Sequence, residues 1–189
     1  MKNCYKLLSL ILLLLITRIQ HADAQEKLSE FRSHYSLTYK YGIADGKDTK
    51  NWAKNSSTVQ IGRSFALNKL LSLSPVVSYT HFGGTNFIKK SAVSLGGEVS
   101  IYPKYLATLI TDNPYDAKND KMYFNVGLQK PLNKSDHSLV FNADLNLFHI
   151  NLCNKFTLSP NLGYQYFISS GNGIDGLGFY TVGVNFMLK

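Results

Sequence analysis

Histidine and cysteine are the side chains best suited to metal or nucleophilic chemistry in this chain, and their spacing favours neither. Beyond residue 25 the histidines are His34, His81, His137 and His149, and no two of them form an H-x-H or H-x-x-x-H pair. A structural or catalytic zinc ion needs several such ligands close together. Cys153 is the only cysteine in this region and has no C-x-x-C partner. We therefore expect no metal centre, no cofactor and ordinary surface or interfacial histidines.

Serine nucleophiles and glycine-rich loops give no catalytic pattern either. Ser78 and His81 are close in sequence, but alternation along a strand places residues three apart on opposite faces. No G-x-S-x-G elbow is present, and SSGNGIDG at 169–176 lacks the Lys-Ser/Thr of a phosphate-binding loop. The sequence therefore predicts a protein that is not an enzyme, with a lipid-modifying enzyme as the less favoured alternative.

Charged side chains inside alternating segments are the other candidates for chemistry. Lys40, Glu98 and Asp144 each lie on the polar face of such a segment, and Asn142 and Asn146 share the face of Asp144. Unpaired charges in a dry interior are costly, so these groups should pair or hold water. Two interpretations follow. They could form a proton or ion path, or, as we favour, an internal polar network that replaces an apolar core.

These side chains belong to segments in which apolar and polar residues alternate with a period of two, as in β-strands. Each segment is near the roughly 9–11 residues that carry a tilted strand across a bilayer. In the sixth, Leu139, Phe141 and Ala143 oppose Asn142 and Asp144. The eight segments span 34–42, 57–67, 70–82, 91–102, 121–130, 138–149, 155–168 and 177–188.

A soluble β-sandwich also alternates, so the composition of the two faces decides between the classes. The polar faces hold mainly Gly, Ser, Thr, Asn and Gln rather than the Lys and Glu of a water-facing sheet. Small polar residues suit the crowded interior of a narrow barrel. Within the second segment, Arg63 is the one charged residue on the apolar face. Aromatic residues collect at segment ends, where an interfacial girdle is expected: Tyr35, Tyr79, Phe82, Tyr102, Tyr123, Phe148, Tyr164, Tyr166 and Tyr180. We predict an antiparallel up-and-down transmembrane β-barrel of about eight strands, too narrow for a general pore.

Two segments carry the same proline pattern. LLSLSPVVSYTHF at 70–82 and KFTLSPNLGYQYF at 155–167 each follow a very short link, LNK or LCNK. Short links are typical of the periplasmic side of an outer-membrane barrel, so both should be strands that ascend from that side, and both chain ends should lie there. Pro75 and Pro160 fall on the apolar face, where the missing N–H requires a bulge or a locally unpaired position.

Longer, polar links at 43–56, 83–90, 131–137 and 169–176 should form the outer loops. The first holds Trp52 among Lys47, Lys50 and Lys54, and we assign Trp52, Lys50 and Lys54 to recognition of anionic lipopolysaccharide or a protein. A lone Trp is also a common membrane-interface anchor. The segment 103–120 is too long for a periplasmic turn. It is either an interfacial or periplasmic segment, or an additional hairpin.

The N-terminus predicts export. Lys2 and Lys6 precede an apolar run at 7–16, and Ala22 and Ala24 provide a small-x-small cleavage pattern. Residues 1–24 are therefore expected to be a signal peptide, and 25–189 a single outer-membrane barrel domain. The chain has a net charge of +8 at pH 7, but its Lys and Arg residues are scattered. Scattered charge and export together argue against nucleic acid as a partner.

The strand LSPNLGYQYF and the ending FYTVGVNFMLK resemble the small outer-membrane β-barrel proteins of the Bacteroidetes type. SLGGEVSIY, LCNK and VGVNFML are further similar to the conjugative-transposon TraO family. The first resemblance implies insertion by the barrel-assembly machinery and contact with outer-membrane lipid. The second implies an accessory protein of a conjugative transfer apparatus, with other envelope proteins as partners. We expect a structural, adhesive or interaction role through the outer loops, with the TraO-like role as the alternative.

Overall fold

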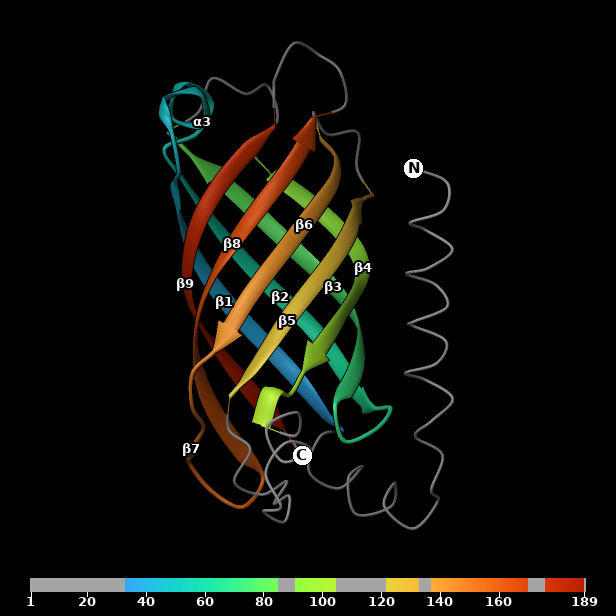
Figure 1. Cartoon of the computed structure of the whole chain (residues 1–189). Coiled ribbons are helices and arrows are strands. Elements are labelled where there is room, and N and C mark those ends of the chain that lie inside the picture. Colours follow the sequence, from blue (N-terminus) through green and yellow to red (C-terminus); the bar gives the residue numbers. More distant parts are fainter. Residues whose placement is uncertain (1–32, 85–90, 105–121, 133–136, 170–175, 189) are drawn as a thin grey trace.

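The computed structural model describes residues 33–84, 91–104, 122–132, 137–169 and 176–188, and these form one closed wall of strands (Figure 1). The long strands are β1 His34–Ala44, β2 Asn55–Ala66, β3 Leu71–Gly83, β4 Ser91–Ile101, β5 Tyr123–Pro131, β6 His137–Asn146, β8 Phe156–Ser169 and β9 Leu177–Leu188. A two-residue strand, β7 Ile150–Asn151, and a short helix, α3 Lys47–Trp52, complete the described elements.

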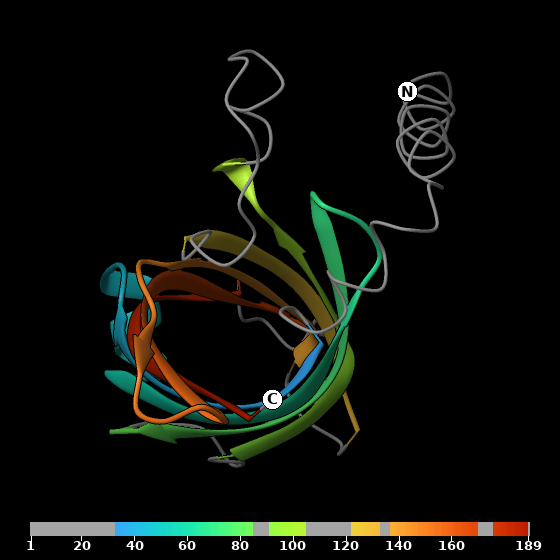
Figure 2. The same cartoon turned by 90° about the horizontal axis from the view of Figure 1, so that it is seen from below.

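Every long strand pairs antiparallel with its neighbours, and the sheet closes on itself. The order is β6-β5-β4-β3-β2-β1-β9-β8, and an additional β6–β8 pairing joins the two ends. Seen along its axis, the wall is a ring (Figure 2). The predicted all-β antiparallel barrel of eight long strands is therefore confirmed.

Segment 138–149 was expected to be one strand, and this boundary was wrong. β6 ends at Asn146, and the chain then forms β7, which pairs with Thr157 and Leu158 of β8. The break coincides with Pro160. The Leu147 N–H donates to the Pro160 carbonyl at 3.1 Å, but Pro160 has no N–H to return.

Pro75 interrupts its ladder in the predicted manner. Gly62 of β2 pairs with Val76 of β3, and Phe65 pairs with Leu73 in the same register. The residues between these two pairs, which include Pro75, are not paired in the β2–β3 ladder. Pro75 points outward and Pro160 lies where β6 has ended. The repeated proline pattern thus marks locally unpaired positions without a shift of register.

The two faces of the wall differ as the alternation predicts. On β1, Leu37 and Tyr39 point outward with 46% and 47% of their surface exposed, whereas Thr38 and Lys40 point inward at 5% and 3%. The same alternation of exposed apolar and buried polar residues continues on the other long strands. The outside of the barrel is therefore apolar and its interior largely polar.

The barrel has two distinct rims. One carries both described chain ends, since Tyr35 pairs with Leu188, together with the 67–70 turn and β7; we call it the chain-end rim. The other carries α3 and is called the α3 rim (Figure 1). The prediction that both ends share a rim is confirmed for His34 and Leu188.

The segment 103–120 leaves from the chain-end rim. Ile101 of β4 lies opposite Phe124 of β5, so no additional strand stands between them in the wall. The extra hairpin that the sequence left open is therefore absent from the barrel wall at this position. Residues 105–121 themselves lie outside the described part of the chain. No helix among the described residues has the length and apolar character needed to span a membrane.

Candidate functional site

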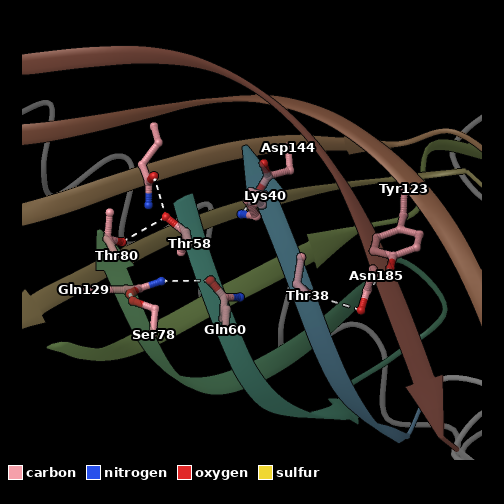
Figure 3. A network of polar contacts seen from close by, with 11 residues as sticks. Thr38, Lys40, Thr58, Gln60, Ser78, Thr80, Tyr123, Gln129, Asp144 and Asn185 are labelled. Atoms are coloured by element: carbon pink, nitrogen blue, oxygen red, sulfur yellow. Dashed lines mark hydrogen bonds and ion pairs between the residues drawn. The ribbon is translucent and has the colours of Figure 1, made fainter. Parts of the chain in front are cut away.

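Three charged residues from three different strands meet in the middle of the lumen. Lys40 of β1 places its Nζ 2.5 Å from Oδ2 of Asp144 on β6, and both side chains are 3% exposed (Figure 3). Glu98 of β4 also attracts Lys40 electrostatically and accepts a hydrogen bond from Gln60. The lumen therefore holds two carboxylates around one ammonium group, in a place where solvent screening is weak.

Each of these charged residues lies opposite a glycine on a neighbouring strand. Lys40 pairs with Gly183, and Asp144 pairs with Gly163. Glu98 pairs with Gly127, where an added Cβ would lie 2.5 Å from Cγ of Glu98. Gly163 and Gly127 thus provide the volume that the Asp144 and Glu98 side chains need inside a narrow barrel.

We call Lys40, Glu98 and Asp144 the charged layer. A chain of hydrogen bonds between neutral amide and hydroxyl groups extends from it. The Gln129 amide donates to Oε1 of Gln60 at 3.1 Å, and Ser78 donates to Oε1 of Gln129 (Figure 3). A second group joins Thr58 to Thr80 at 2.9 Å and to Oε1 of Gln165 at 3.1 Å. These bonds link β2, β3, β5 and β8 across the lumen, so side chains join strands that are not neighbours in the sheet.

The lumen near the chain-end rim is filled by aromatic and amide groups. Thr38 donates to Oδ1 of Asn185 at 3.2 Å, and the Asn185 amide donates to the Tyr123 hydroxyl at 3.1 Å. The ring of Tyr123 stacks on Tyr102 at 5.3 Å and meets His149 edge-on at 5.7 Å. This layer occupies the lower part of the interior.

An apolar cluster fills the lumen below α3. Phe82, Phe167 and Phe179 are at most 1% exposed, and their ring centroids lie 4.9–6.0 Å apart. Ala53 belongs to this cluster and Trp52 packs against it. We call this group the aromatic plug. It replaces polar contacts with close apolar packing at this end of the barrel.

Three members of the predicted aromatic girdle are therefore in the wrong place. Phe82, Tyr102 and Tyr123 lie inside the lumen, with 1%, 3% and 2% of their surface exposed. The girdle prediction was made from residue type and position near a strand end, which does not identify the face. Tyr35, Tyr79, Phe148 and Tyr180 are exposed, as expected.

Of the recognition residues proposed from the sequence, Lys50 and Trp52 lie in the short helix α3, and Lys54 follows its end. Lys50 and Lys54 are exposed, whereas Trp52 is half-buried against the aromatic plug. Asp45 anchors the helix, because it accepts a hydrogen bond from Thr49 at 3.0 Å and its N–H donates to the Gly178 carbonyl at 3.1 Å. The Gly178 N–H in turn donates to the Thr49 hydroxyl at 3.2 Å. The structure thus separates an anchored Trp52 from the exposed lysines.

Not every residue of the predicted lumen network is joined to it. Asn142 and Asn146 are buried, but their side-chain atoms have no hydrogen-bond partner among the described residues. Lys40, Asp144 and Glu98 are brought together, whereas Asn142 and Asn146 share the lumen without bonding to them. The sequence did not identify Gln60, Gln129 and Asn185 as network members; their only signal was their place on polar faces.

The fold does not bring Ser78 and His81 together. Ser78 points into the lumen and His81 outward, so the two are on opposite faces as predicted. Among the described residues no three His, Cys, Asp or Glu side chains gather into a metal-binding group.

Comparisons with known proteins identify no family for this chain. No family model matches the chain, and no curated protein matches it in sequence. A de novo designed transmembrane β-barrel matches over 82% of this chain and 95% of its own, with 15% identity and a TM-score of 0.43. Neisserial surface protein A matches over 83% and 95%, with 8% identity and a TM-score of 0.49. The Yersinia pestis outer membrane protein Ail matches over 82% and 99%, with 14% identity and a TM-score of 0.40.

The outer surface of the barrel shows whether it faces water or lipid. The exposed face is a continuous band of large apolar residues, among them Leu37, Ile61, Val77, Leu128 and Val182. Soluble proteins rarely expose so large an apolar surface, and a closed barrel is the only sheet that leaves no unpaired edge in lipid. The chain folds as a transmembrane β-barrel of the outer-membrane type. Its apolar band is therefore in contact with membrane lipid.

Proposed function

We propose that this protein is a non-enzymatic outer-membrane barrel that binds a surface partner through the α3 rim. Residues 1–24 would direct export, and the barrel-assembly machinery would insert 25–189 with the chain-end rim on the periplasmic side. The observation that carries the proposal is the way α3 is fixed. Trp52 packs on the aromatic plug while Lys50 and Lys54 stay exposed. A rigid barrel that holds a short polar segment at its rim is a common arrangement for recognition.

The exposed charge at this helix suggests the class of partner. Lys47, Lys50 and Lys54 are exposed around Trp52, with Asp48 as an exposed acidic neighbour. Clustered ammonium groups at the outer leaflet suit the phosphates of lipopolysaccharide, or an acidic surface on a protein. We give lipopolysaccharide the preference, because it surrounds the outer rim of any barrel in an outer membrane.

The test removes the charge of two lysines, one in α3 and one just beyond its end, and leaves the helix in place. Lys50→Gln and Lys54→Gln should together weaken lipopolysaccharide binding to the reconstituted barrel several-fold, as measured by surface plasmon resonance, while heat-modifiable gel mobility is unchanged. Lys155→Gln, at the opposite rim, is the matched control and should bind as the wild type does. Equal binding by the double variant and the wild type would reject the α3 rim as the binding surface.

The second candidate is a TraO-like accessory role in conjugative transfer. It is supported by the sequence resemblance and by the end of β4 at Ile101, which lies at the rim opposite α3 and directly precedes 103–120 in the chain. The periplasmic partners of such a protein would meet this segment. Pull-down from cells that carry the transfer genes should then lose its partners when 104–119 is deleted and keep them when Lys50 and Lys54 are changed. The reverse pattern would favour the surface role.

A further inference from the structure

Arg63 is a charged residue on the lipid-facing side of the wall. It lies opposite Tyr35 on β1, and Tyr35 in turn lies opposite Leu188 on β9. Tyr35 and Leu188 are exposed members of the apolar band, and Arg63 is exposed beside them. A charge on this surface is tolerated near the membrane interface and costly at the midplane. Arg63 meets that condition, because β2 ends three residues later at Ala66.

The guanidinium group is held between two rings. Its central carbon lies 4.9 Å from the ring centroid of Tyr35 and 4.9 Å from that of Phe65. Both rings belong to outward-facing side chains that flank Arg63 on its own strand and on β1. Such cation–π contacts orient the planar group while leaving the N–H donors at its edge available to an oxygen ligand.

The described charged residues on the side of the barrel where Arg63 lies are all basic. The charged residues that the structure describes at the chain-end rim are Arg63, Lys69, Lys104 and Lys155, and all are basic. The described acidic residues lie elsewhere, Asp45 and Asp48 at the α3 rim and Glu98 and Asp144 in the lumen. Among the described residues no carboxylate is therefore placed to neutralise Arg63, and its guanidinium charge favours an anionic partner.

We propose that Arg63, clamped between Tyr35 and Phe65, binds the phosphate of an anionic phospholipid in the leaflet at the chain-end rim. Arginine donates two parallel N–H bonds to phosphate oxygens, and the two rings offer an apolar surface to the upper acyl chain. A net-anionic headgroup such as phosphatidylglycerol is favoured over a zwitterionic one, because phosphatidylcholine brings its own cation close to the guanidinium group.

The site is tested by native mass spectrometry of the full barrel released from nanodiscs of equimolar phosphatidylglycerol and phosphatidylcholine. The wild type should retain phosphatidylglycerol in preference to phosphatidylcholine. Arg63→Gln should lower that preference about fivefold, the effect of one cation near a membrane surface. Arg63→Lys keeps the charge but lacks the planar fork, so it should give an intermediate value. Unheated gel mobility establishes that each variant is folded.

Lys155→Gln is the matched control, since it removes a basic residue from the same rim outside the two-ring clamp. It should lower the preference for phosphatidylglycerol less than Arg63→Gln does. A preference that is absent in the wild type, or unchanged in Arg63→Gln, overturns the proposal, and so does an equal loss in Lys155→Gln. If Arg63→Gln does not fold, Arg63→Lys tests the proposal instead. A lipid preference of Arg63→Lys equal to that of the wild type would reject the clamped guanidinium as the binding geometry.

Discussion

Asp144 lies directly opposite Gly163 on the neighbouring strand, and its carboxylate occupies the space that a side chain at Gly163 would fill. A Cβ at Gly163 would also approach the Ala143 carbonyl to 2.6 Å. Glu98 has the same relationship with Gly127, whereas the space beside Gly183, which pairs with Lys40, is occupied by the Tyr39 carbonyl and the side chain of Asn161. The charged layer of the lumen is thus built from pairs of one large charged residue and one glycine.

The first prediction concerns this pairing. Gly163→Ala should destabilise the barrel by about 1–3 kcal/mol, because the new methyl overlaps both a carboxylate and backbone. Urea unfolding in detergent micelles, followed by tryptophan fluorescence, measures the change. Gly46→Ala is the control, since nothing lies within 4 Å of a Cβ at that position. A loss that is no larger for Gly163→Ala than for Gly46→Ala would contradict the packing account.

A second prediction concerns the buried ion pair. Lys40→Met leaves two buried carboxylates without a cation and should cost about 3–5 kcal/mol of unfolding free energy. Adding Asp144→Leu removes one of those carboxylates, so the double variant should be more stable than Lys40→Met alone. The same urea titration applies to both. If the losses of unfolding free energy caused by Lys40→Met and Asp144→Leu simply add in the double variant, Lys40 and Asp144 do not stabilise each other.

Trp52 gives a third prediction, on the anchoring of α3. Trp52→Ala removes the contact with the aromatic plug and should raise the hydrogen-exchange rate of amides in 47–53 while leaving those of β6 unchanged. Trp52→Phe keeps most of the apolar contact and should stay close to the wild type. If the amides of α3 exchange equally in Trp52→Ala and the wild type, Asp45 and Thr49 suffice to hold the helix.

The fourth prediction is the absence of a general pore. The aromatic plug, the charged residues Lys40, Glu98 and Asp144, and the layer around Tyr123 fill different levels of the lumen, as an eight-stranded barrel allows. Purified protein in planar bilayers should therefore give no stable single-channel current above the leak. Steady currents that disappear in Lys40→Met or Glu98→Gln would instead establish an ion path through the charged layer.

A fifth prediction follows from the apolar outer band. The protein should be extracted from outer-membrane fractions only by detergent, and its gel mobility should change on heating as the closed barrel unfolds. Recovery as a soluble periplasmic monomer would contradict the membrane assignment.

Local pattern alone determined the number of long strands and the face on which most of their residues lie. Strand geometry alternates side chains with a period of two, so Leu37 and Lys40 could be assigned to opposite faces without any knowledge of their neighbours. The ladder interruption at Pro75 was also predictable, because proline lacks the N–H wherever it occurs. These properties depend on one residue and the strand that contains it.

Aromatic side chains near strand ends were only partly predictable. Tyr35 and Phe82 both lie close to the end of a strand, but one faces lipid and the other joins the aromatic plug. Residue type favours an interface in both cases, since a ring suits lipid headgroups as well as a packed lumen. The face is set by the alternation along the strand and by the side chains available for packing across the lumen, which for Phe82 are Phe167 and Phe179.

Contacts across the lumen were decided by the tertiary structure alone. Lys40 and Asp144 are 104 residues apart and meet only because β6 pairs with β8 and closes the sheet. The glycine opposite each charged residue depends on strand register, which is set by all the pairings around the ring together. The clamp of Arg63 between Tyr35 and Phe65 has the same origin, because the β1–β2 register brings Tyr35 beside Arg63.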